Sequence, residues 1–144
     1  MMSILISACS DDKTKEDEFK VQIDRFEDIQ ILRYQIPGFD ELDLRQKKLL
    51  YYLSEAAKSG RDITFDQNFK YNLFVKRILD AVVVSYTGDK STEDFEKFMI
   101  YTKKVWFASG IHHHYSTDKF LPDFSIDYFK TLVLNSDHTK LPLK

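Results

Sequence analysis

Apolar residues recur with a helical period over most of the chain, and the clearest case runs from Leu44 to Ser59. Five apolar side chains share one side of this predicted helix. They are Leu49, Leu50, Leu53, Ala56 and Ala57. Asp43 stands at the N-cap position, and Gly60 follows where a left-handed C-terminal residue is favoured. We therefore predict a capped amphipathic helix over these residues.

Three more helices are predicted downstream by the same reasoning. One spans about residues 70–86 and is closed by Gly88, with a buried stripe of Val75, Ile78, Leu79, Val82 and Val83. The next begins at Ser91 as N-cap and ends at Ser109-Gly110. The last is capped by Ser125 and follows a long loop. The apolar and aromatic stripes of these helices are expected to form the core.

The region before the first helix is read differently. From Phe26 to Ile36 the apolar positions begin ambiguously and then alternate, which is typical of a strand, until Pro37-Gly38 stops the pattern. The predicted fold class is thus mostly α (α+β), with about four helices and one or two early strands.

Composition narrows the function classes. The chain has 144 residues, 43% of them hydrophobic and 15% aromatic, which is enough for a globular core. The net charge is −2, with both signs interspersed, so no basic stripe for nucleic acid is visible. We predict no nucleic-acid partner.

The first residues resemble the end of a bacterial lipoprotein signal, because a short apolar run and small residues precede Cys9, the single cysteine. We predict a shortened signal over residues 1–9 with lipidation at Cys9, a polar linker over residues 10–24, and an incomplete domain over residues 25–144. A lipidated Cys9 places the protein in the bacterial cell envelope and provides its contact with a membrane; without lipidation the protein is cytoplasmic.

Three consecutive histidines in the loop before the last helix suggest metal binding. In an extended segment only His112 and His114 point to the same side, whereas catalytic zinc needs three ligands. His138 is the other histidine, and no HExxH helix is present. We therefore expect no metal site in this chain and a polar loop that hydrogen-bonds locally or lines a cleft. Gly-rich phosphate loops and nucleophile elbows are also missing, and Asp62 and Asp66 are interpreted as capping or turn residues.

Three segments, residues 29–39, 51–68 and 105–122, resemble bacterial members of the dipeptidyl peptidase III family. They carry the runs IQILRYQIPGF, YYLSEAA with GRDI and FDQN, and VWFASGIHHHY with KFLP. Eukaryotic members keep an aromatic residue at the position of Tyr115, whereas Ile111 and His112 replace their asparagine and tyrosine. The resemblance covers about residues 25–135.

The resemblance implies a two-lobed zinc enzyme that removes dipeptides from short peptides, with zinc held on a HExxGH motif that this chain lacks. The chain would be the N-terminal part of the lower lobe, inactive alone, with zinc and the remaining lobe supplied by the rest of the enzyme. We expect Tyr115, His112, His114 and Lys119 to bind peptide, and no cofactor to be bound by this chain. A large apolar face should be left uncovered. The alternative is a freestanding lipid-anchored helical interaction module without catalysis.

Overall fold

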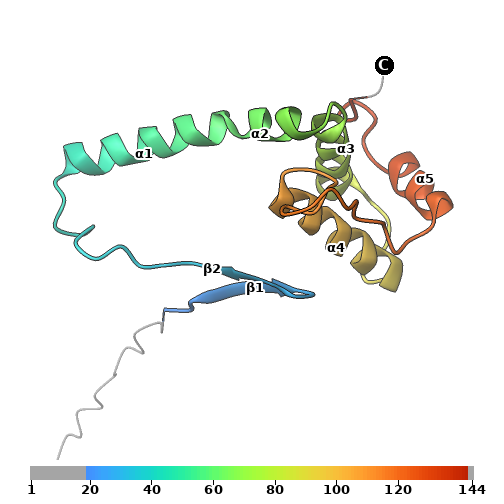
Figure 1. The fold of residues 1–144 in the computed structure, drawn as a ribbon, viewed down its shortest axis with the longest axis horizontal. Helices are drawn as coiled ribbons and strands as arrows, with labels where there is room; N and C mark the ends of the chain where they lie inside the picture. Colours follow the sequence, from blue (N-terminus) through green and yellow to red (C-terminus); the bar gives the residue numbers. More distant parts are fainter. Residues whose placement is uncertain (1–18, 143–144) are drawn as a thin grey trace, which may run out of the picture.

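The computed structural model describes residues 19–142, which form a two-stranded hairpin followed by five helices (Figure 1). The elements are β1 (Gln22–Phe26), β2 (Ile29–Leu32), α1 (Leu44–Ser59), α2 (Arg61–Asn68), α3 (Asn72–Ser85), α4 (Glu93–Ala108) and α5 (Ile126–Leu134). The predicted fold class, mostly α with a small β element, is confirmed. The short helix α2 was missed by the sequence analysis, which expected turns around Asp62 and Asp66. The shortened signal predicted over residues 1–9, with Cys9, lies outside the described residues.

β1 and β2 form an antiparallel hairpin in which Phe26 pairs with Ile29. The two-residue connection needs a positive φ, which Glu27 adopts at 49°. Two ion pairs hold the hairpin against α4, Lys103 to Asp24 and Lys104 to Glu27, each with a nitrogen–oxygen distance of 2.6 Å. β1 begins at Gln22, so the polar linker predicted to extend to residue 24 ends earlier than expected.

α1 and α2 run almost end to end across one side of the molecule (Figure 1). Gly60 joins them in a right-handed conformation, with φ −83° and ψ −6°, and accepts a hydrogen bond from the Ile63 amide at 3.1 Å. The prediction of a left-handed Gly60 is wrong because the chain continues into another helix and does not reverse. Asp43 caps α1 as predicted, accepting from the Gln46 amide.

The other helix ends follow local hydrogen bonding. Ser125 caps α5 as predicted. The N-cap of α4 is Thr92, whose hydroxyl accepts from the Phe95 amide, and not the predicted Ser91. Ser91 is engaged instead by Asp89, which accepts from both its amide and its hydroxyl. The N-cap of α4 therefore lies one residue later than predicted.

The core lies where α3, α4 and α5 meet, and α2 contributes one residue to it. Its buried members are Phe65, Leu79, Val82, Tyr86, Phe95, Phe98, Val105 and Leu132. Gly88 does not end α3; the helix ends at Ser85, and a Cβ on Gly88 would lie 2.2 Å from the Tyr86 hydroxyl oxygen. This glycine lets the chain pass close to the Tyr86 ring. The core stripes predicted for the later helices are thus the ones that pack.

Candidate functional site

The three histidines lie in a compact turn that we call the histidine hairpin, residues 111–120. His112 and Lys119 form an antiparallel bridge. Two backbone hydrogen bonds of 2.8 Å close it, from the Phe120 amide to Ile111 and from the His113 amide to Asp118. The segment predicted as a long polar loop is therefore closed by backbone hydrogen bonds of its own.

The side chains of His112 and Lys119 meet on one side of the histidine hairpin, as cross-strand neighbours do. Both contact Phe69, which follows α2: the His112 ring lies 5.4 Å from the Phe69 ring, edge to face, and the Lys119 ammonium nitrogen lies 5.9 Å from it. These two predicted site residues are thus brought together. Their contact with Phe69 attaches the hairpin to the helical body.

His114 and Tyr115 occupy the tip of the histidine hairpin. The His114 ring packs edge to face on Phe107 at 5.1 Å and contacts the Tyr115 ring at 4.2 Å. The Tyr115 amide donates to Nδ1 of His113 at 3.2 Å. Tyr115 itself is 88% exposed. Of the four predicted site residues, His114, Tyr115 and Lys119 are exposed and His112 is half-buried.

A polar cavity of about 320 Å³ lies beneath the histidine hairpin and is lined in part by Asn68, Asn72 and Gly110. Asn72 is fully buried at the start of α3, and its side-chain oxygen accepts from the Ile111 amide at 3.1 Å. Its side-chain nitrogen has no partner among the described residues. Sequence reasoning missed Asn72, although it stands three residues before Val75, on the apolar stripe of α3.

Within residues 19–142, no group of three histidine, cysteine, aspartate or glutamate side chains is arranged to hold a metal ion. His112 and His114, which were expected to share a side, both line the polar cavity, and their rings pack on Phe69 and Phe107 respectively. No helix in the same range is both long and apolar enough to cross a bilayer.

The uncovered apolar face that we expected lies on α1. The side chains of its predicted stripe remain largely accessible, with Leu49, Leu50 and Leu53 exposed by 58%, 44% and 56%, and no residue of α1 is buried. We call Leu49, Leu50, Leu53, Ala56 and Ala57 the α1 stripe. α1 also carries four basic residues and one acidic residue. They are Arg45, Lys47, Lys48 and Lys58, with Glu55.

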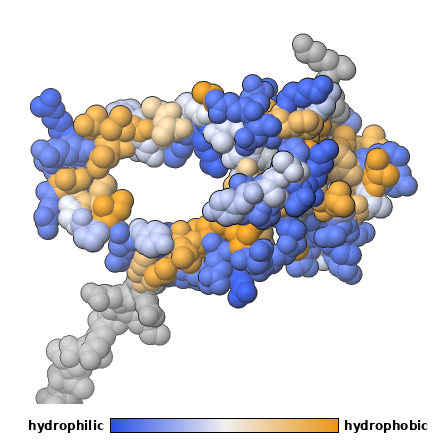
Figure 2. Space-filling view, in the orientation of Figure 1, coloured by the Kyte–Doolittle hydropathy of each residue, from blue (hydrophilic) through white to orange (hydrophobic). Residues whose placement is uncertain are grey.

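Exposed apolar side chains continue along the segment that leads from β2 to α1. Tyr34 is 78% exposed, Ile36 72% and Phe39 39%. Figure 2 shows an opening through the molecule, bounded by this segment, α1, the β-hairpin and the helical body, with apolar surface on its rim. An amphipathic helix that faces such an opening lacks the partner that its stripe requires.

The chain was compared with models of protein families and with curated proteins. No family model matches the chain. A search of curated proteins found transcription factor PDR8 of Saccharomyces cerevisiae, 32% identical over 132 residues. The match covers 78% of this chain and 18% of the transcription factor, so the chain spans less than a fifth of that relative.

This match contradicts the dipeptidyl peptidase III interpretation. The relative is a transcription factor, and no finding supports a peptidase fragment, its lower lobe or a metalloexopeptidase activity. The alternative, a freestanding lipid-anchored module, is not supported either. The resemblance rested on three short segments, whereas the match to the transcription factor covers 78% of this chain. The roles expected of Tyr115, His112, His114 and Lys119 in binding stay predictions.

Proposed function

We propose that this chain is a protein-interaction module of a transcription-regulating protein, and that it binds a helical segment of a partner protein on the α1 stripe. The observation that carries the proposal is the exposure of α1: a capped helix of 16 residues with an apolar stripe and no buried residue. An isolated helix of this length has marginal stability in water, so its apolar face gains most from a partner. The similarity to a transcription factor supports the biological setting.

The chemistry of α1 favours one kind of partner. Helix-in-groove recognition places apolar side chains at positions i, i+3, i+4 and i+7 against a complementary face. Leu50, Leu53 and Ala57 stand at i, i+3 and i+7 of such a pattern. The excess of basic over acidic residues on α1 favours an acidic amphipathic segment, since complementary charges speed association and exclude wrong partners.

A DNA-reading role fits the same helix less well. Duplex recognition depends on many phosphate contacts from lysine and arginine, and the whole chain carries a net charge of −2. On α1 the basic residues Arg45 and Lys47 fall on either side of the apolar stripe and do not form a stripe of their own. We therefore assign α1 to a protein partner, and DNA binding becomes an outcome that the experiment can reveal.

The test tethers the chain to a reporter promoter through an unrelated DNA-binding domain and compares variants of α1. The unmodified chain should change reporter transcription, and Leu49→Asp combined with Leu53→Asp should abolish that change by placing charge on the stripe. Leu44→Asp is the matched control, because Leu44 is 68% exposed on the opposite side of α1 and an acidic residue in the first turn suits the helix dipole.

Expression level and helical circular dichroism should be equal in all variants. A reporter that does not respond to the unmodified chain, or one that responds equally to the stripe variant, contradicts the proposal. A different outcome is that the untethered chain shifts a DNA duplex at physiological salt and loses this ability in an Arg45→Ala, Lys48→Ala variant. That result would show that α1 binds nucleic acid.

A further inference from the structure

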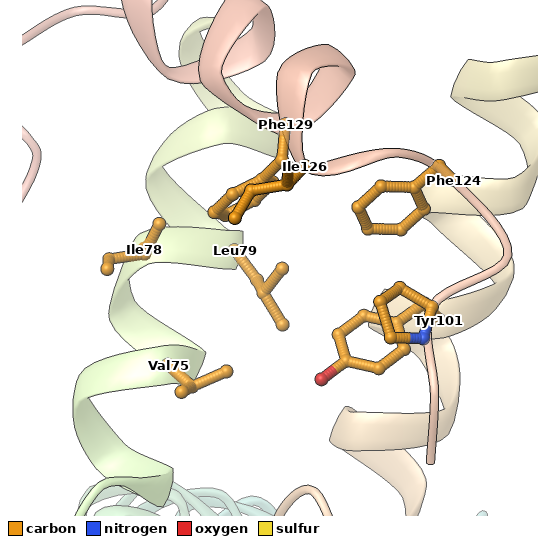
Figure 3. A pocket seen from close by; sticks show the side chains of 8 residues that line it. Val75, Ile78, Leu79, Tyr101, Phe124, Ile126 and Phe129 are labelled. Atoms are coloured by element: carbon orange, nitrogen blue, oxygen red, sulfur yellow. The ribbon is translucent and has the colours of Figure 1, made fainter.

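A second cavity, of about 310 Å³, lies between α3, α4 and α5 (Figure 3), and neither α1 nor the histidine hairpin contributes a residue to its lining. Helices α3, α4 and α5 and the segment leading into α5 contribute its walls. Its lining includes Val75, Ile78, Leu79, Tyr101, Phe124 and Phe129. This volume is at the lower end of the range of small-molecule sites, roughly 300–1,000 Å³.

The lining is apolar and rich in aromatic rings. Within residues 19–142, no charged side chain lines the cavity. Phe124 meets the Tyr101 ring edge to face at 5.9 Å and stands 6.1 Å from the Phe129 ring. Side chains arranged in this way offer both faces and edges to an aromatic guest. A charged guest would lose its hydration here without gaining a partner.

One polar group faces this apolar space. Figure 3 shows the Tyr101 hydroxyl pointing from α4 toward the space beside Val75. Burial raises the pKa of Tyr101 above its ordinary value of 10.0, with no hydrogen bond or neighbouring charge contributing. The hydroxyl is therefore protonated at neutral pH and is able to donate to a guest or to accept from it.

We propose that this cavity is a binding site for an uncharged, mainly aromatic small molecule that carries one hydrogen-bonding group, and that Tyr101 fixes its orientation. The apolar rings supply the contact area, and the single hydroxyl supplies the selectivity, which is the usual division of roles in a small-molecule site. Ile126 stands at the mouth, since it lines the cavity and is 72% exposed.

The site does not depend on the partner surface proposed for α1. α1 provides none of the residues that line the cavity. Ligand binding and partner binding can therefore succeed or fail separately. A ligand held among α3, α4 and α5 would stabilise the packed part of the molecule by binding its folded form.

The experiment uses the whole chain and two probes of nearly equal shape, 4-propylphenol and propylbenzene, with binding followed by ligand-observed NMR and by the thermal midpoint. Both probes should bind, and the phenol should bind more tightly. Tyr101→Phe keeps the ring and removes the hydroxyl. It should weaken binding of the phenol by about 5-fold to 10-fold while leaving propylbenzene unchanged.

A second pair of variants tests the location. Ile126→Trp should fill the mouth and abolish binding of both probes. Leu134→Trp, at a residue of α5 that is 69% exposed and does not line the cavity, should leave binding intact. Absence of binding at millimolar probe, equal binding of the phenol to the Tyr101→Phe variant, or full binding to the Ile126→Trp variant would each overturn the proposal. A complex in which an apolar side chain of a partner protein displaces the probe would also overturn the proposal.

Discussion

Helices α1 and α4 are both 16 residues long, and both begin with a side-chain cap, yet their apolar faces have opposite fates. α4 buries Phe95, Phe98, Thr102 and Val105 against its neighbours. α1 buries nothing, although its apolar residues also recur with a helical period. An amphipathic pattern therefore defines a face without saying which surface covers it. Other parts of the same chain cover the apolar face of α4, and we propose that a partner protein covers that of α1.

The largest expected difference between the two helices is in stability. Phe98→Ala removes a ring that is 0% exposed and packs against the rings of Phe95, Phe124 and Phe129, so it should lower the free energy of unfolding by about 3–5 kcal/mol. Leu53→Ala, in the α1 stripe, should change it by less than about 0.5 kcal/mol. Denaturant titration of both variants is the measurement. Equal losses would show that α1 is packed in solution and would remove the basis for a partner surface.

The histidine hairpin joins the packed region through Gly110, and this junction gives the second prediction. Gly110 has a φ of 157°, and a Cβ there would lie 2.2 Å from the side-chain nitrogen of Asn72. Gly110→Ala should therefore cost on the order of 2 kcal/mol, because either Asn72 or the hairpin must move. Chemical denaturation measures the loss.

Gly38→Ala is the matched control for this prediction. Gly38 also has a positive φ, 81°, but a Cβ there meets nothing nearer than a Glu41 oxygen at 3.9 Å. Its substitution should cost only about 1 kcal/mol, the penalty of the left-handed backbone. Equal costs at the two sites would mean that the contact with Asn72 is unimportant.

The contrast between the regions also marks what the sequence could predict. Periodicity located α1, α3, α4 and α5 and the core stripes, because helix formation and burial leave regular spacing. It missed α2 since Asp62 and Asp66 are as suitable for turns as for a helix. Asp62 instead forms ion pairs with Lys76 and Arg77 of α3, at 3.5 Å and 3.3 Å, which no local pattern reveals.

The candidate sites were harder to predict than the fold. The histidines were recognisable as unusual, but their partners Phe69 and Phe107 lie in other elements. The cavity around Tyr101 depends on how three helices meet, and the sequence near Tyr101 reads as an ordinary aromatic stripe. Such sites arise from tertiary packing, which single-segment patterns do not contain.

The third prediction concerns a defect inside the packed region. The Thr102 hydroxyl is buried in α4 and has no hydrogen-bond partner among the described residues. Thr102→Val replaces the hydroxyl with a methyl group of similar shape and should stabilise the fold by about 1 kcal/mol. Thr131→Val in α5 is the control, because its exposed hydroxyl donates to the Asp127 carbonyl at 3.0 Å, and its loss should not stabilise. A destabilised Thr102→Val variant would indicate a hidden partner for the hydroxyl.

The smallest expected effect belongs to the link between the β-hairpin and the packed region. The hydrogen bond from Lys103, followed by that from the Arg25 amide, lowers the pKa of Asp24 below its ordinary value of 3.8. Because the pKa is lower in the folded protein, the stabilisation is present above about pH 4 and is lost as the pH falls through the folded value.

Lys103→Met keeps the apolar stem and removes the charge. It should raise the pKa of Asp24 only part of the way to 3.8, since the Arg25 amide still donates, and NMR titration of the Asp24 carboxyl measures this shift. Lys130→Met, which removes a comparable ion pair with Asp127 in α5, should leave the Asp24 titration unchanged. An Asp24 titration that is the same in both variants would mean that the β-hairpin is not held to α4 by this pair, and that the region around the opening is looser than its ion pairs imply.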